Sequence, residues 1–193
     1  MIPLLLKKVQ AKNYRIFTAG HYNVNIIAIR HKGRPNEFDD TIALVYKDES
    51  GWIQREFACT SDPGVYWLNS PGRKEGTAVL APGQYRGTHM IDKHRGKYDA
   101  LCQRLGKVKV YRDGNKDGVI DWDKFDESVA GMYGINIHRA SATRTSVSVD
   151  RWSAGCIVIA SYDDFECFMK VIRKAAQGWG NKFSVTLLEE EDV

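Results

Sequence analysis

The sequence lacks features that mark several classes of protein. No stretch of its 193 residues approaches the roughly 20 consecutive apolar residues of a membrane-spanning helix. None of its 4 cysteines stands in a C-x-x-C pair, so zinc-binding and thioredoxin-like classes have no support. Four cysteines are also too few for a disulfide framework in a chain of this length, so we expect mostly buried free thiols in a reducing compartment.

Strong charge of either sign is also missing. The formal net charge is +4, from 28 Lys and Arg against 24 Asp and Glu, and the basic residues are scattered along the chain. Scattered positive charge does not predict a nucleic-acid partner. The apolar run at residues 2–6 is shorter than the core of a signal peptide, so we expect no export signal and synthesis in the cytoplasm.

What the sequence does contain predicts one β-rich α+β domain over residues 1–193, with few helices. Alternating apolar residues between turn signals predict strands at 23–30, 41–47, 52–60, 76–80, 83–89, 108–111 and 183–188. The turn segment 48–51 (DESG) indicates a β-hairpin. Ser161 and Asp164 form a capping box at the start of an amphipathic helix that Gly178 and Gly180 end.

One segment joins a cysteine to a turn of small residues. Ser153, Ala154, Gly155 and Cys156 stand directly before the apolar residues 157–159. We expect Gly155 to let the backbone approach a substrate, and successive N–H groups of the turn to hold an oxyanion. A thiol placed there attacks a carbonyl if a base favours its thiolate. The alternative is a core role for Cys156, since free cysteine is among the most buried residue types.

The candidate base is His138, which lies near the end of an alternating, strand-like run at residues 133–139. Imidazole suits this role because its pKa is close to neutrality. We expect two antiparallel strands, joined by the polar loop 140–151, to bring His138 and Cys156 to one edge of a sheet.

These residues resemble a known enzyme family. Ser153, Gly155 and Cys156 resemble the S-(H/R)-G-C motif of L,D-transpeptidases, the YkuD-type catalytic domain, and residues 135–138 resemble its upstream I-H segment. Residues 81–85 (APGQY) are similar to the T-P-x-G-x-(F/Y) strand entry of that fold. The resemblance covers roughly residues 77–160 and implies an L,D-transpeptidase-like β-sandwich or barrel.

The resemblance also implies a chemistry. His138 would deprotonate Cys156, and the thiolate would attack a carbonyl of a peptidoglycan stem peptide, with the oxyanion on N–H groups near Gly155 and Cys156. An amine or water would then resolve the acyl-enzyme. Ser153 and Ser141 are the candidates for a third group that orients His138. No cofactor is required, and the cell wall would be reached if the chain is exported or released.

Three positions depart from the family pattern. Arg139 stands where Gly is common, Ala154 where His or Arg is common, and Val158 where a polar or basic residue is common. Because such positions line the family's substrate groove, the substrate is in doubt and a divergent bacterial or phage branch is indicated. The expected substrate-binding residues are Arg139, Ala154, Trp152 and Tyr85, with a core position as the alternative for Trp152.

Two further motifs suggest metal ions. Asp113, Asn115, Asp117 and Asp121 match the start of an EF-hand loop, which predicts a structural Ca²⁺, but Lys124 stands where a bidentate Glu is needed. The alternative is a turn whose side chains bond to their own backbone. The segment 89–94 has the spacing H-x-x-D-x-H, for which we favour a surface or groove-lining role over metal binding.

Two other functions stay open. A cysteine peptidase or amidase would use the same residues without transfer to an amine. A binding module on a catalytically dead scaffold is favoured by the changes at residues 139, 154 and 158. Rapid alkylation of Cys156, slowed by His138→Ala, would separate the enzymes from the binding module.

Overall fold

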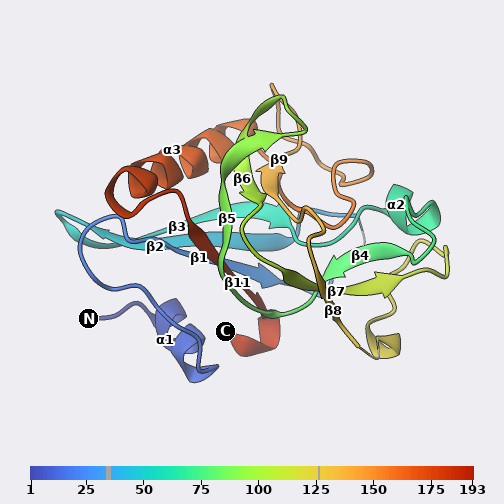
Figure 1. The fold of residues 1–193 in the computed structure, drawn as a ribbon, viewed down its shortest axis with the longest axis horizontal. Helices are drawn as coiled ribbons and strands as arrows, with labels where there is room; N and C mark the ends of the chain where they lie inside the picture. Colours follow the sequence, from blue (N-terminus) through green and yellow to red (C-terminus); the bar gives the residue numbers. More distant parts are fainter. Residues whose placement is uncertain (34–35, 126) are drawn as a thin grey trace.

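The computed structural model describes residues 1–33, 36–125 and 127–193, and most of its strands form one closed barrel. The barrel follows the order β1-β11-β5-β6-β9-β10-β3-β2. Its strands are β1 (Asn25–Arg30), β2 (Asp40–Asp48), β3 (Gly51–Thr60), β5 (Gly83–His94), β6 (Tyr98–Gln103), β9 (Ile137–Arg139), β10 (Ile157–Ile159) and β11 (Phe183–Glu189). A small sheet of β4 (Thr77–Leu80), β7 (Val108–Asp113) and β8 (Val129–Gly131) stands beside it, as Figure 1 shows.

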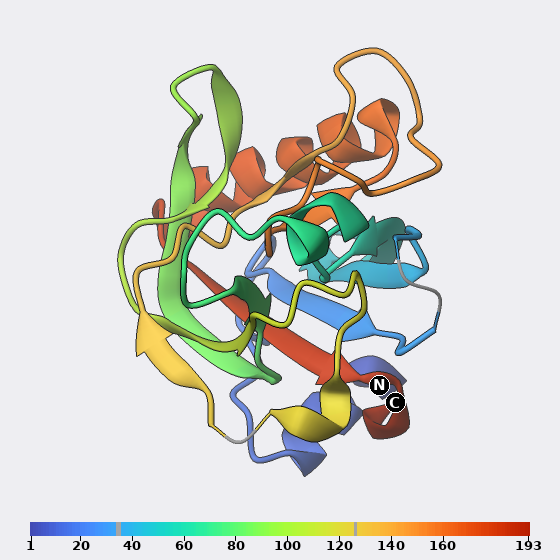
Figure 2. The ribbon, with the colours of Figure 1, turned by 90° about the vertical axis from the view of Figure 1, so that its right-hand side faces the viewer.

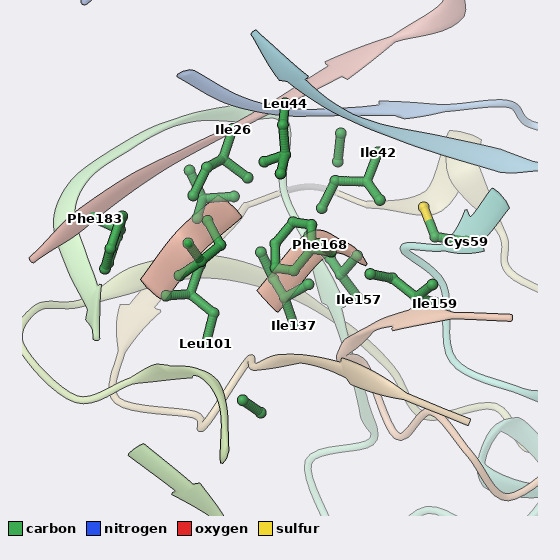
Figure 3. Packing of buried hydrophobic residues seen from close by; sticks show 14 of the residues in the cluster. Ile26, Ile42, Leu44, Cys59, Leu101, Ile137, Ile157, Ile159, Phe168 and Phe183 are labelled. Carbon is green, nitrogen blue, oxygen red and sulfur yellow. The ribbon is translucent and has the colours of Figure 1, made fainter. Parts of the chain in front are cut away.

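The main core lies between the barrel strands and the long helix α3 (Tyr162–Trp179). The Ser161 hydroxyl caps α3 by accepting a hydrogen bond from the Asp164 N–H, as the capping box predicts. Phe165 and Phe168 of α3 are buried in the same cluster as Ile residues of the strands (Figure 3). The helix therefore covers the inner face of the barrel wall.

A second apolar cluster lies on the other side of the same strands. The helix α1 (Leu4–Ala11) packs Leu6 and Val9 against residues of β1 and β2 that face away from the main core. Figure 1 shows α1 and α3 on opposite sides of these strands, and both chain ends lie on the α1 side. The buried strand β1 is accordingly apolar on both faces, which is why its sequence reads as an almost continuous run of Ile.

The structure confirms the β-rich α+β class and most of the predicted elements. The hairpin at residues 48–51 joins β2 to β3, and Asp48 is opposite Gly51. Sequence reasoning missed α1, the short helix α2 (Val65–Asn69), and the strands β6 and β8. In the described part of the chain, no helix is both long and apolar enough to span a membrane.

The pairing of β9 with β10 differs from the prediction. The two strands are parallel, with Ile137 opposite Ile157 and His138 opposite Val158. The loop 140–151 therefore does not make a hairpin but returns the chain to the same end of the sheet, as a crossover between parallel strands must. The prediction of antiparallel strands was wrong because a long polar loop permits either direction.

A buried arginine closes one end of the barrel. Arg30 is fully buried, and its Nε lies 2.8 Å from an oxygen of Asp62. Its Nη1 donates to the Leu80 carbonyl at 2.8 Å and its Nη2 to the Ser61 carbonyl at 3.1 Å. Burial raises the pKa of Asp62 to about 7, against the opposing effect of Arg30.

Candidate active site

Cys156 stands at the start of β10 on the face that turns away from the main core. Ile157 and Ile137 point into the core cluster, so their neighbours on each strand point to the opposite face. Cys156 and His138 therefore share that face on adjacent strands. Cys156 as a residue is partly exposed, and its sulfur lies 3.4 Å from both the Asn136 backbone nitrogen and the Gly134 carbonyl oxygen.

The turn before Cys156 is held by one hydroxyl. The Ser153 side chain is fully buried; it donates to the Cys156 carbonyl at 2.8 Å and accepts from the Gly155 N–H at 3.1 Å. Ser153 therefore fixes the shape of the turn and does not orient His138. Since the Gly155 N–H is already bonded, the Cys156 N–H, which has no partner among the described residues, is the better oxyanion donor.

The backbone geometry explains why residue 155 is a glycine. Its φ is +115°, and a Cβ at this position would lie 2.3 Å from the carbonyl oxygen of Ala78 on β4. The close approach that the sequence suggested is therefore to the protein's own backbone and not to a substrate. This close approach fixes the turn before Cys156 against the small sheet.

His138 is oriented by a backbone carbonyl. Its Nδ1 lies 2.8 Å from the Arg139 carbonyl oxygen, which can only accept, so Nδ1 carries the proton and Nε2 is the basic nitrogen. Burial, followed by the nearby imidazole of His94, lowers the pKa of His138 to about 3. Ser141, the other candidate for this orienting role, instead accepts from the Thr143 N–H at 3.2 Å.

His94 lies in the segment for which the sequence favoured a surface or groove-lining role, and it does line the cavity described below. It ends β5, and its ring stacks on that of His138 with centroids 4.1 Å apart. Its Nδ1 lies 3.1 Å from the side-chain nitrogen of Asn136, and the Tyr98 hydroxyl lies 3.4 Å from Nδ1 of His138. No signal in one sequence announces this contact, because β5 and β9 lie on either side of β6 in the barrel.

An open cavity of about 360 Å³ adjoins the His94–His138 pair. It lies between the tip of the β5–β6 hairpin and the loop after β9, which rise on the same side of the molecule in Figure 2. Trp152 lines this cavity and is 42% exposed, so the groove-wall interpretation describes its position better than a core role does. The basic residues that line this cavity are Arg95, Lys97, Arg139 and Arg151.

A second cavity, of about 220 Å³, lies on the other side of the turn. Ala154 and Tyr133 are among its lining residues, together with residues of β4. Trp152 and Ala154, two residues apart, thus face different cavities. Tyr85 belongs to neither: it is buried in the main core, and its hydroxyl donates to the Ala81 carbonyl.

The resting site contains a neutral thiol and a neutral imidazole. Burial raises the pKa of Cys156, although the Asn136 N–H and the charge of Arg95 act in the opposite direction. No hydrogen bond joins the sulfur to His138 in the part of the chain that the structure describes. The two side chains share a face but are not yet engaged.

The side chains of the H-x-x-D-x-H segment lie in different surroundings. His89 is buried and bonds the Ile135 carbonyl through Nε2 at 2.8 Å, whereas Asp92 is paired with Arg104. The segment 89–94 therefore does not converge on one point. Across residues 1–33, 36–125 and 127–193, no three His, Cys, Asp or Glu side chains are gathered tightly enough to hold a metal.

Comparisons of this chain with protein-family models, with curated proteins and with solved structures found no match. The geometry of the site is therefore what any functional argument must use.

Proposed function

We propose that this protein is a cysteine acyltransferase of the L,D-transpeptidase type that acts on peptidoglycan stem peptides. The observation that carries the proposal is the common face of Cys156 and His138 on neighbouring strands, where His138 also lines an open cavity. The closed barrel with few helices is consistent with an L,D-transpeptidase-like fold, which we include in the proposal. The protein would act on the cell wall after export or release.

In the proposed reaction, Nε2 of His138 takes the proton of the Cys156 thiol as the sulfur attacks a peptide carbonyl. The tetrahedral oxyanion is stabilised by the Cys156 N–H. When the intermediate collapses, the leaving amine takes the proton from His138 and a thioester remains on Cys156. An acceptor amine then attacks the thioester and restores the thiol.

The depressed pKa of His138 determines when the proton leaves the thiol in this mechanism. A neutral resting pair means that proton transfer accompanies attack, in contrast to enzymes that store a thiolate–imidazolium pair. The Arg139 carbonyl takes the orienting role that a carboxylate has in other triads. Catalytic hydrogen bonds often tighten only with substrate bound, so the missing contact between sulfur and ring is compatible with this role.

Two cavities on either side of the turn provide places for the two partners of a transfer reaction. The cavity at Trp152 and the cavity at Ala154 would separate the acyl donor from the acceptor amine. The basic lining of the first cavity suits a donor with carboxylates, which stem peptides carry. A peptidase would place the two sides of its scissile bond in the same two cavities, so it is the second candidate and the acceptor experiment decides between them.

The test is incubation with tetrapeptide stems, with and without an amine acceptor, followed by mass analysis. We expect a thioester on Cys156, a cross-linked product with the acceptor, and loss of both in Cys156→Ala. Cys167→Ser is the matched control because Cys167 is exposed on α3 and outside the site. Hydrolysis alone, with the acceptor present, would favour the peptidase.

Acylation of the thiols by an activated ester, a probe that presents a carbonyl, separates either enzyme from a dead binding module. Cys59 and Cys102 are buried, so the exposed Cys167 is the informative comparison. Because the resting thiol is neutral and loses its proton only as it attacks a carbonyl, we expect an activated ester to acylate Cys156 faster than Cys167, and His138→Gln to remove that advantage. Stem-peptide binding without turnover, with Cys156 slower than Cys167 in both proteins, would refute the enzymatic proposal.

A further inference from the structure

The loop that follows β7 concentrates acidic and amide side chains. Asp113 ends β7, and Gly118 turns the loop with a φ of +81°. The Asn115 side-chain nitrogen lies 2.8 Å from an oxygen of Asp117 and 2.6 Å from an oxygen of Asp121. Asn115 therefore bridges two carboxylates that would otherwise repel each other.

Asp113 provides a separate observation that points to a missing ligand. The residue is only 4% exposed, and its Oδ1 is buried without a hydrogen-bond partner. A buried carboxylate oxygen without a partner is costly, and each such group in a folded protein needs an explanation.

We propose that this loop binds Ca²⁺ through side-chain oxygens of Asp113, Asn115, Asp117 and Asp121. Hard oxygen ligands at the first, third, fifth and ninth positions of a loop with Gly at the sixth suit this ion. The site is independent of the acyl-transfer chemistry proposed above. Its role is structural, since the chain continues through β8 to Gly134 and Asn136, which contact the Cys156 sulfur.

Two hydrogen-bond donors occupy the position that we propose for the calcium ion. Lys124 holds its ammonium 2.9 Å from an oxygen of Asp121, and the Asn115 amide presents nitrogen rather than oxygen to the carboxylates. These bridges explain why the acidic side chains are not gathered around one point. Calcium displaces the ammonium and draws Oδ1 of Asn115 inward by rotation of the amide.

The position of Trp122 offers a direct assay. Tb³⁺ replaces Ca²⁺ in oxygen sites, and excitation of Trp122, next to Asp121, should sensitise its luminescence. We expect calcium to displace the terbium with a dissociation constant on the order of 10⁻⁴ to 10⁻³ M, because the bidentate Glu is absent. Asp113→Asn and Asp117→Asn should weaken binding at least about tenfold, whereas Glu56→Gln, on the exposed surface of β3, should not.

Thermal unfolding gives a second readout. In about 10 mM calcium chloride the wild type should melt roughly 4 to 8 °C higher than in EDTA, whereas the shift of Asp117→Asn should be about half of that or less. Asp117 is exposed, so this variant keeps its fold even if Asp113→Asn does not. Lys124→Ala should bind calcium up to about fivefold more tightly, since the competing ammonium is gone.

Three results would overturn the proposal. The first is a melting temperature that calcium does not raise in the wild type. The second is terbium luminescence that is as strong in Asp117→Asn as in Glu56→Gln. The third is an equal stabilisation by magnesium, which would exclude a site selective for calcium.

Discussion

The buried imidazole of His138 makes stability depend on pH in a way that one variant can isolate. Its pKa falls from 6.5 in the unfolded chain to about 3 in the fold, so between these values the unfolded chain binds the additional proton. Stability from this group is fully present above pH 6.5 and is lost as the pH falls. At pH 5 the loss is about 2 kcal/mol, from 2.303RT times the interval between 6.5 and 5.

The measurement is the free energy of urea unfolding of wild type and His138→Gln between pH 7 and pH 5. The wild type should lose about 2 kcal/mol more than the variant over this interval. Asp62 acts in the opposite direction, because burial raises its pKa to about 7, but it acts equally in both proteins. His21→Gln is the matched control, since His21 is exposed and its replacement should leave the wild-type slope unchanged.

If the free energy of unfolding changed with pH in the same way for wild type and for His138→Gln, the reasoning would be refuted. This result would mean that the fold accepts a proton on His138 at pH 5, so that the imidazole is not held neutral. The proposed neutral resting pair with Cys156 would then also be lost.

Three further predictions concern stability. Gly155→Ala should lower the free energy of unfolding by more than about 2 kcal/mol, because its Cβ would lie 2.3 Å from the Ala78 carbonyl oxygen at a positive φ. Ser153→Ala removes the hydroxyl that bonds the nucleophile turn twice and should cost about 1 to 3 kcal/mol, measured by urea unfolding. Arg30→Ala leaves the partly buried Asp62 without its cation and should cost about 3 kcal/mol; an unchanged unfolding midpoint would contradict this.

The fold class and most strands followed from local pattern alone. The β2–β3 hairpin and the capped helix α3 were predictable because their signals lie within a few residues of one another. The helix α1 was missed because three leucines after Pro3 give no clear period, and its formation depends on packing against β1 and β2. The direction of β9 against β10 depends on the path of a long loop, which local pattern does not determine.

The candidate site was predictable in its residue types but not in its internal bonds. The motif at Ser153 and Cys156 indicated a nucleophile turn, whereas the roles of Ser153 and Gly155 needed coordinates. His94 joins the site through barrel closure, which brings together strands that are distant in the sequence. Tyr85 was expected at the groove because its motif adjoins a strand entry, yet alternation along β5 turns it into the core.

The stacked imidazoles of His94 and His138 bear directly on how the thiol could be activated. A proton on either ring would lie in a buried site beside the other ring and near Arg95 and Arg139, and burial together with these charges keeps both rings neutral. A neutral His138 can accept a proton only if developing negative charge nearby compensates for it, and the attacking sulfur and the oxyanion supply that charge. In the proposed reaction the thiol therefore releases its proton only when a carbonyl is in place, and a thiol that stays neutral at rest is less prone to oxidation.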